Sequence, residues 1–174
     1  MAQVNYFKVF FTTVLLIVGT RFVLNGGSFF WFDGANLVIH EAGHALFFWF
    51  GRFIGILGGT ILQLFVPFVL ALYFFIGKKE PYSASVIIFW LGQSFLNVSI
   101  YARDALKREL PLVGLGGGEP EHDWNNILFE LGLLRHTETV ANIIFTTGVL
   151  VIIAAIAMGY YYSFSEKEDK SFNE

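Results

Sequence analysis

The chain contains no cysteine. That absence excludes disulfide bonds, thiolate zinc sites and cysteine nucleophiles, so any metal ion must be bound by histidine, aspartate or glutamate side chains. Charge is also scarce, because Lys, Arg, Asp and Glu make up only 14% of the 174 residues and the formal net charge is −3. No basic cluster stands out in the sequence, which argues against nucleic acid as a partner.

Hydrophobic residues are what the chain has in abundance. They make up 55% of the sequence, aromatic residues make up 18%, and the mean hydropathy is +0.61. This composition is typical of an integral membrane protein, whose solvent is the lipid bilayer. Apolar segments recur almost to the C-terminus, so we expect the spans to belong to the mature protein, with no secretory leader followed by a soluble domain.

The long apolar segments predict an all-α fold, a polytopic membrane bundle of about five spans with one short interfacial helix. The expected spans are residues 9–24, 29–50, 53–76, 84–102 and 141–162. Within the second of these, Asp33 and Gly34 interrupt the apolar run, so its helix is expected to begin near Ala35. Residues 1–165 should therefore form a single membrane-embedded domain, followed by a polar C-terminal tail over residues 166–174.

The main polar segment lies between the last two spans, over residues 103–139. Its glycine run at 114–118 lacks the Lys-Ser/Thr ending of a phosphate loop, which favours a hinge. Asp123 is a good helix N-cap, and the apolar residues after it recur at amphipathic spacing, which predicts a short helix at the membrane surface. Lys and Arg divide almost evenly between alternate loops, and the narrow balance favours the cytoplasmic side for both the N-terminus and residues 103–139.

The most informative motif is His-Glu-Ala-Gly-His at residues 40–44, in the middle of an apolar stretch. On a helix, residues four apart share a face, so His40 and His44 could bind one zinc ion while Glu41 stands beside a metal-bound water. Ionisable groups at membrane depth are costly, by about 2.5 to 3.5 kcal/mol for a mid-bilayer charge. A metal ion is the obvious compensating partner, and the alternative is a pair of buried histidines bonded to neighbouring carbonyl groups.

A catalytic zinc ion needs a third protein ligand and one position left open for water. His122 is the first candidate, because a third imidazole completes a three-histidine site and leaves Asp123 to cap the helix or orient a ligand. Asp123 itself is the close alternative. The alternative without a metal is that His122 is a surface residue and that Asp123 is only a helix cap.

The fourth predicted span carries four polar side chains at spacings that place them on one helical face. They are Gln93, Asn97, Tyr101 and Asp104. Lipid would not tolerate such a stripe, so it should line the bundle interior. Asn97 or Tyr101 could donate a hydrogen bond to an oxyanion, and Asp104 could orient a ligand histidine or bind the metal. Ordinary interhelical hydrogen bonding and, for Asp104, a plain interfacial ion pair are the alternatives.

The third predicted span has a small-residue face at Gly55, Gly58 and Gly59, which would let another helix approach closely. Gln63 stands alone as a polar side chain in this span. A structural role and a role in positioning substrate are both open to it.

The motif at residues 39–44, Ile-His-Glu-Ala-Gly-His on a membrane helix, resembles the site-2 protease family of intramembrane zinc metalloproteases. The resemblance implies that His40 and His44 are zinc ligands and that Glu41 activates the zinc-bound water. That family takes its third ligand from an aspartate in an Asp-Gly motif on a later membrane helix. Asp123, which is followed by Trp124 in place of glycine, is the nearest counterpart in this chain.

A second resemblance covers a longer stretch, from His40 to about His136. It is to a group of small bacterial membrane proteins with an HEAGH helix, a Gly-Gly-x-x-x-Gln helix, an Asp-Ala pair and a His-Asp-Trp segment. Here the last three correspond to residues 58–63, 104–105 and 122–124. This resemblance implies a common architecture around these residues and a location in a bacterial inner membrane.

Together these features predict a zinc-dependent intramembrane hydrolase, a metalloprotease that acts on membrane-embedded protein substrates. Glu41 would serve as general base and then as general acid. The alternatives are a metal-binding scaffold or assembly factor without catalysis, and a transport component that passes ions or protons. The uninterrupted apolar run over residues 45–50 weakens transport, because a transporter would favour a polar path on both sides of the site.

Overall fold

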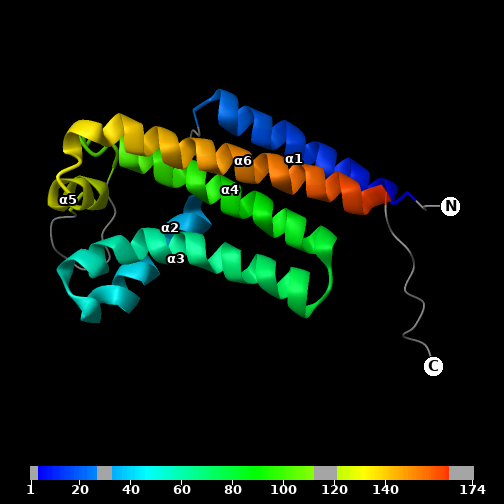
Figure 1. The fold of residues 1–174 in the computed structure, drawn as a ribbon, viewed down its shortest axis with the longest axis horizontal. Coiled ribbons are helices and arrows are strands. Elements are labelled where there is room, and N and C mark those ends of the chain that lie inside the picture. Colours follow the sequence, from blue (N-terminus) through cyan, green and yellow to red (C-terminus); the bar gives the residue numbers. More distant parts are fainter. Residues whose placement is uncertain (1–3, 27–32, 112–120, 165–174) are drawn as a thin grey trace.

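Every regular element is a helix in the part of the chain described by the computed structural model, residues 4–26, 33–111 and 121–164. The long elements are α1 (Tyr6–Leu24), α2 (Asp33–Phe47), α3 (Arg52–Leu72), α4 (Pro81–Arg103), α5 (Asp123–Glu130) and α6 (Thr137–Phe164) (Figure 1). Short helical turns are η1 (Phe48–Phe50), η2 (Tyr73–Gly77) and η3 (Leu134–His136). The all-α prediction is confirmed for these residues. The predicted hinge at 114–118 and the polar tail at 166–174 lie outside them.

Four helical segments within the described ranges are long and apolar enough to cross a membrane. They are Tyr6–Leu24, Arg52–Gly77, Pro81–Arg103 and Leu134–Phe164. The remaining predicted span contains α2, whose 15 residues extend only about 22 Å at 1.5 Å per residue. A hydrocarbon core is about 30 Å thick, so α2 is too short to cross it. The prediction of five spans is therefore one too many for the described chain.

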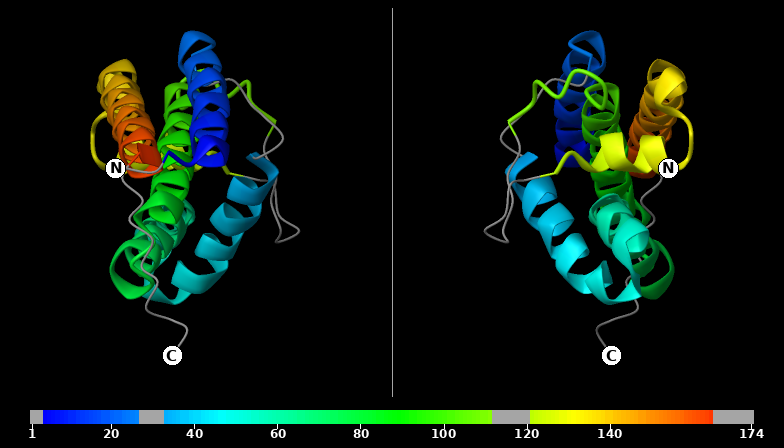
Figure 2. Two further views of the ribbon diagram at one scale, coloured as in Figure 1. Left: turned by 90° about the vertical axis from the view of Figure 1, so that its right-hand side faces the viewer. Right: turned by 90° about the vertical axis from the view of Figure 1, so that its left-hand side faces the viewer.

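Helix α4 lies at the centre of the molecule, with α2 and α3 on one side and α1 and α6 on the other (Figures 1 and 2). Its contact with α6 depends on glycine. A Cβ built on Gly148 would lie 2.9 Å from the Gly92 carbonyl oxygen, and one built on Gly92 would lie 2.6 Å from Ile152. No larger residue fits at either position without a shift, so the two backbones approach closely through this pair.

The start of α1 and the end of α6 meet at one end of the bundle. The backbone N–H of Asn5 donates to the Ser163 carbonyl at 3.0 Å, which joins the start of α1 to the end of α6. At the opposite end of α6, Glu138 pairs with Arg103 at the end of α4. The end of α4 and the start of α6 thus lie at the far end of the bundle from the start of α1 (Figure 1). Three candidate spans, Tyr6–Leu24, Arg52–Gly77 and Pro81–Arg103, lie between these two ends of the bundle along the chain. The expectation that the N-terminus and residues 103–139 both face the cytoplasm stays a prediction.

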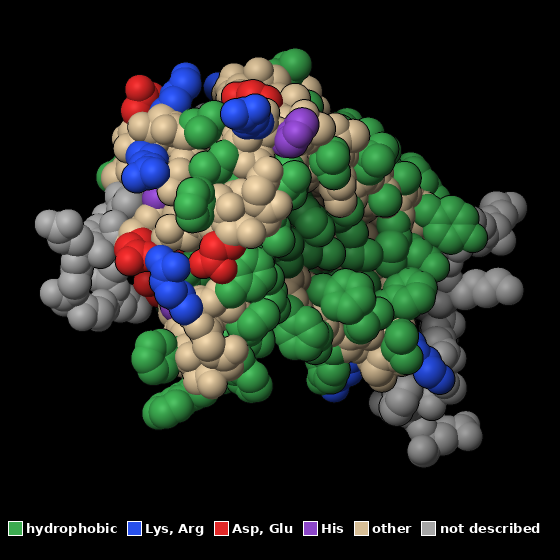
Figure 3. Space-filling model, turned by 60° about the vertical axis from the view of Figure 1, so that its left-hand side comes forward, with side chains coloured by type: hydrophobic (Ala, Val, Ile, Leu, Met, Phe, Trp, Pro, Cys, Tyr) green, Lys and Arg blue, Asp and Glu red, His purple; other side chains and the backbone are tan. Residues whose placement is uncertain are grey.

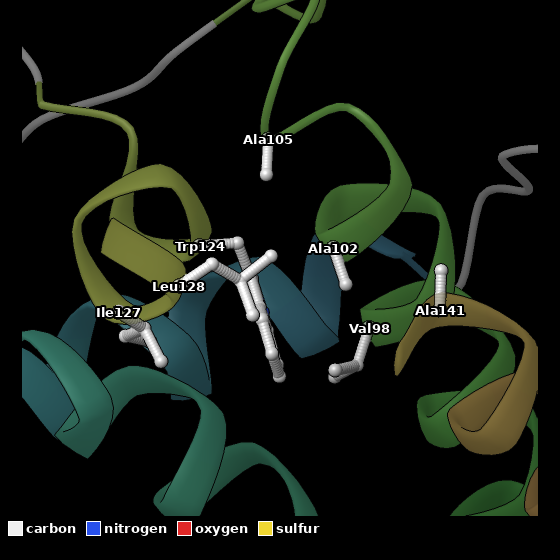
Figure 4. Close-up of a cluster of buried hydrophobic side chains, with 7 residues drawn as sticks. All are labelled: Val98, Ala102, Ala105, Trp124, Ile127, Leu128 and Ala141. Atoms are coloured by element: carbon white, nitrogen blue, oxygen red, sulfur yellow. The ribbon is translucent and has the colours of Figure 1, made fainter. Parts of the chain in front are cut away.

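Helix α5 closes the far end by burying its apolar side. Trp124, Ile127 and Leu128 are buried together with Val98 and Ala102 of α4. Figure 4 shows them in one cluster, completed by the alanines at 105 and 141. The predicted short amphipathic helix is confirmed over these eight residues. Its position at the membrane surface stays a prediction.

The cap of α5 differs from the prediction. His122 is the N-cap residue, and its Nδ1 atom accepts a hydrogen bond from the Asn125 backbone N–H at 3.2 Å. Asp123 is the first residue inside the helix. The His122 imidazole accepts the hydrogen bond from the first turn of the helix. The Asp123 carboxylate is therefore not needed as a cap and can contact side chains inside the bundle.

Charged and hydrophobic side chains occupy different parts of the surface. On the face shown in Figure 3, most charged side chains gather toward one end and hydrophobic side chains cover the flank. Arg52, at the start of α3, pairs with Glu121 at 3.0 Å and with Glu130 at 3.1 Å. Large hydrophobic side chains are exposed along α1, α3 and α6, among them Phe7, Phe65 and Ile153. A surface of this kind is that of a membrane protein.

Candidate metal centre

The His-Glu-Ala-Gly-His motif lies on α2, as predicted, with its two histidines toward α3. His40 is buried, and the His44 side chain is 26% exposed. The close contact with α3 is made through glycines. A Cβ on Gly59 would lie 2.6 Å from His40 Nε2 and 2.7 Å from His44 Nε2. The predicted small-residue face of α3 therefore has a definite use, because it admits both imidazoles.

Asp123 of α5 completes a group of three potential ligands. Its Oδ2 atom lies 3.0 Å from His40 Nε2 and 3.2 Å from His44 Nε2. All three ligand atoms lie within 4.8 Å of one another. Across a tetrahedral zinc ion with bonds of 2.0 to 2.1 Å, neighbouring ligand atoms are about 3.3 Å apart. The donor set and its spacing thus fit a metal ion of this size.

His122 lies next to this group but makes its contacts elsewhere. Its Nε2 atom is 3.2 Å from Asp104 Oδ2, and its Nδ1 atom accepts from the Asn125 backbone. Asp104 also accepts backbone hydrogen bonds from Glu109 and Leu110, at 3.0 Å each. Of the three candidates for the third ligand that the sequence left open, His122, Asp123 and Asp104, the geometry brings Asp123 to the histidine pair. His122 and Asp104 instead hold α5 in place.

The outer nitrogens of the two ligand rings have partners that only accept hydrogen bonds. His40 Nδ1 lies 3.1 Å from Gln63 Oε1, and His44 Nδ1 lies 2.9 Å from the Gly55 carbonyl oxygen. Each Nδ1 atom therefore carries hydrogen, and in a neutral ring the lone pair is on Nε2. Both lone pairs face the Asp123 carboxylate. Three acceptors meeting at one point need a positive charge between them, either protons or a metal cation.

The electrostatics of the site agree with this requirement. Burial alone would lower the pKa of His44, but its hydrogen bonds to Asp123 and to the Gly55 carbonyl outweigh burial and raise the pKa from 6.5 to about 9. Burial alone would raise the pKa of Asp123, but the hydrogen bonds with His40 and His44 lower it from 3.8 to about 2. The carboxylate is thus kept ionised and the ring beside it favours a positive charge.

Glu41 is half-buried and follows the first ligand histidine on α2. Its negative charge is near enough to raise the pKa of His44. The carboxylate therefore lies beside the three-ligand group, on the residue next to His40. That position is the one the motif predicts for a general base.

Asn97, the other residue predicted to take part in catalysis, is bonded between helices. Its Oδ1 atom accepts from Gln63 at 2.8 Å, and its Nδ2 atom donates to Asp33 at 3.0 Å. These bonds match the interhelical alternative. The predicted oxyanion role of Asn97 stays a prediction.

The polar stripe of α4 does line the bundle interior. The Tyr101 hydroxyl group donates to Asp123 Oδ2 at 3.2 Å and accepts from the Asp123 backbone N–H at 3.1 Å. Gln93 donates to Asp33 at 2.6 Å. The stripe thus connects the third ligand to the start of α2.

Two further residues of α2, Asp33 and Asn36, form hydrogen bonds with the polar stripe of α4, and no role for either is predicted from the sequence. Asp33 was interpreted only as a break in the apolar run, and Asn36 was not singled out. Both are buried. Their signal was periodicity, since 33, 36, 40 and 44 recur at helical spacing and so share one face. Extending the helix two residues upstream of Ala35 would have revealed it.

Comparisons of the chain with family models, with curated proteins and with solved structures give no match. The function must therefore be argued from the residues of the site.

Proposed function

We propose that this protein is a zinc-dependent intramembrane hydrolase that cleaves peptide bonds of membrane-embedded protein substrates. The observation that carries the proposal is the approach of Asp123 to His40 and His44, 3.0 and 3.2 Å away, beside Glu41. Two histidines and one carboxylate with a fourth position left open are the ligand set of catalytic rather than structural zinc.

The resemblance to site-2 proteases supports the same proposal. In that family the third ligand is an aspartate, and the residue that approaches the histidine pair here is Asp123 rather than His122. The position in the chain agrees as well, since Asp123 comes 83 residues after His40. The resemblance to small bacterial membrane proteins favours a bacterial inner membrane as the location.

The chemistry divides among few groups. His40 Nε2, His44 Nε2 and Asp123 Oδ2 would hold the ion, which supplies an acidified water molecule and polarises the substrate carbonyl. Glu41 accepts a proton as the water oxygen bonds to the carbonyl carbon. It then delivers that proton to the leaving nitrogen as the C–N bond breaks, which yields a carboxylic acid and an amine. A substrate helix must unwind locally first, because its backbone carbonyls are otherwise hydrogen-bonded.

Zinc binding is the first test. Purified wild-type protein should bind one zinc ion, and both His40→Ala and Asp123→Ala should lose it, as measured by elemental analysis and competition with a chromophoric chelator. His136→Ala is the matched control, because His136 is exposed on η3 and outside the ligand group. Equal zinc content in wild type and Asp123→Ala would reject the proposed metal centre.

Glu41→Gln separates catalysis from binding. The variant should keep its zinc and lose turnover by about 100-fold or more, as expected when a general base is removed. The assay follows cleavage of a panel of single-pass membrane peptides in proteoliposomes by mass spectrometry. Cleavage by wild type that persists unchanged in Glu41→Gln would rule out this mechanism. Zinc binding without cleavage of any peptide would favour the metal-binding scaffold.

A further inference from the structure

A chain of hydrogen bonds connects the start of α2 to the first metal ligand through two other helices. Asp33 Oδ1 accepts from Asn97 Nδ2 at 3.0 Å, and Asn97 Oδ1 accepts from Gln63 Nε2 at 2.8 Å. Gln63 Oε1 then lies 3.1 Å from Nδ1 of His40. The path leaves α2 at Asp33, crosses α4 and α3, and returns to α2 at the ligand ring.

The direction of every bond in this path follows from the carboxylate. An ionised carboxylate only accepts, so Asn97 must turn its NH₂ group toward Asp33 and its oxygen toward Gln63. Gln63 must then donate to Asn97 and turn its own oxygen toward His40. The remaining hydrogen must sit on His40 Nδ1. Asp33 thus dictates, through two amides, which nitrogen of His40 carries hydrogen.

A second branch reaches the same carboxylate oxygen from the other side. The indole N–H of Trp90 donates to Asn36 Oδ1 at 2.9 Å, and Asn36 Nδ2 donates to Gln93 Oε1 at 2.8 Å. Gln93 Nε2 donates to Asp33 Oδ1 at 2.6 Å. An indole can only donate, so this branch has its direction set independently at its far end. Both branches agree that Asp33 is the common acceptor.

Burial makes these directions costly to reverse. Gln63 is 2% exposed, Gln93 is 5% exposed and Asp33 is 8% exposed. A reversed amide at this depth would bring two donors or two acceptors together without water to separate them. A hydrogen-bonded path that served only to join helices would not need to end on His40. This path ends on Nδ1 of His40, and the other ring nitrogen, Nε2, faces Asp123.

We propose that Asp33 is a positioning residue of the metal centre, which acts through Asn97 and Gln63 to keep hydrogen on Nδ1 of His40 and so present Nε2 to the cation. The inference rests on the proposed function, because it assumes that His40 binds a metal ion. Outer partners of this kind fix the tautomer and orientation of ligand histidines, and their loss commonly weakens metal binding by about 10- to 100-fold.

The test of affinity compares two variants in the same network. Asp33→Leu nearly preserves shape but offers Asn97 no acceptor, so zinc affinity should fall by about 10- to 100-fold. Trp90→Phe removes a bond at the far end of the other branch and leaves the Asp33 carboxylate in place, so it should leave zinc affinity unchanged even if it lowers stability. An equal loss of affinity in both variants would overturn the proposal in favour of a purely structural network.

The tautomer is measured without metal, so that the result does not depend on the proposed function. In chelator-treated Asp123→Ala protein, neither a cation nor a carboxylate competes for Nε2. Nitrogen NMR at a pH where the ring is neutral, with His40 assigned by its loss in His40→Ala, should show hydrogen on Nδ1. Adding Asp33→Leu, which removes the acceptor, should give a mixture of tautomers. An unchanged Nδ1–H tautomer overturns the inference, whereas failure of wild type to bind zinc rejects only the proposed function.

Moving the acceptor provides a rescue. Gln63→Glu places an ionised carboxylate directly against His40 Nδ1, so the double variant with Asp33→Leu should recover zinc affinity to within about threefold of wild type. A double variant as weak as Asp33→Leu alone would contradict the proposal. If Asp33→Leu does not fold, Gln63→Met removes the last acceptor of the path, and the same loss of affinity and of tautomer preference is expected from it.

Discussion

At the scale of single residues, the neighbours His122 and Asp123 contact different parts of the molecule. His122 caps α5 and bonds to Asp104, whereas Asp123 turns toward His40 and His44. Both residue types can cap helices and bind zinc, so the choice depends on the direction of the chain where it enters α5.

Gly59 offers a test of how closely the rings must approach α3. In Gly59→Ala the added methyl group would lie 2.6 to 2.7 Å from both Nε2 atoms. Zinc affinity should fall by at least about tenfold, because the ligand nitrogens must move. Gly77→Ala is the control, since Gly77 has no part in the site and its methyl group would lie 3.5 Å from the Tyr73 ring, an ordinary contact. Titration with a chelator competitor measures both, and equal affinities would contradict the described packing.

Asp104 should make stability depend on pH. Burial raises the pKa of this carboxyl group, but hydrogen bonds from the Leu110 and Glu109 backbone and from His122 outweigh burial and lower it below 3.8. A group with a lowered pKa stabilises the fold above its unfolded value and loses that contribution as the pH falls through its folded value. Wild type should therefore lose stability on acidification below about pH 4.

The measurement is thermal unfolding in detergent between about pH 3 and 7. Asp104→Asn should be less stable than wild type at neutral pH, because it has no charge to pair with the backbone donors and His122. It should also lose less stability on acidification. The same pH dependence in both proteins would show that another carboxyl group is responsible.

At the scale of elements, α2 is a half-span that depends on its neighbours. Its 15 residues do not cross a bilayer by themselves, and its buried side bears Asp33, Asn36 and His40. Those polar groups are satisfied by α3 and α4, through Gln63, Gln93 and Trp90 among others. Irregular or polar helices at membrane depth are tolerated where protein surrounds them, which explains how this helix can carry ionisable residues.

The contact between α4 and α6 gives a prediction at this scale. Gly148→Ala would place a methyl group 2.9 Å from the Gly92 carbonyl oxygen and the Leu96 side chain. Overpacking of this kind should lower the free energy of unfolding by about 1 to 3 kcal/mol. Gly77→Ala is the control, because its methyl group would meet only the Tyr73 ring at 3.5 Å. Denaturant unfolding in micelles compares them, and a stable Gly148→Ala would show that the helices can separate without cost.

At the scale of the whole molecule, the four candidate spans predict that the start of α1 and the end of α6 lie on one side of the membrane. The hydrogen bond between Asn5 and Ser163 joins these two ends. The ligand group includes Asp123 at the start of α5, near the opposite end of the bundle (Figure 1). The candidate metal centre is therefore predicted to lie toward the side that carries residues 103–111.

The lack of cysteine makes this topology simple to test, because an introduced cysteine is then the only thiol in the protein that can react with a labelling reagent. Tyr6→Cys and Phe164→Cys should react with an impermeant thiol reagent from the same side of sealed vesicles, and Lys107→Cys should react from the other side. All three positions are exposed. Labelling of Tyr6→Cys and Phe164→Cys from opposite sides would show that the chain crosses the membrane an odd number of times, in agreement with five spans.

The sequence by itself determined the class of fold and half of the candidate site. Composition and apolar run length are enough to predict membrane helices, and His40, Glu41 and His44 are related by the local geometry of one helix. Only the tertiary structure decided that α2 stops short of a span, that Asp123 rather than His122 meets the histidine pair, and that Asp33 reaches His40 through other helices. These contacts join residues as many as 83 positions apart, so they depend on how the helices pack and on no local pattern.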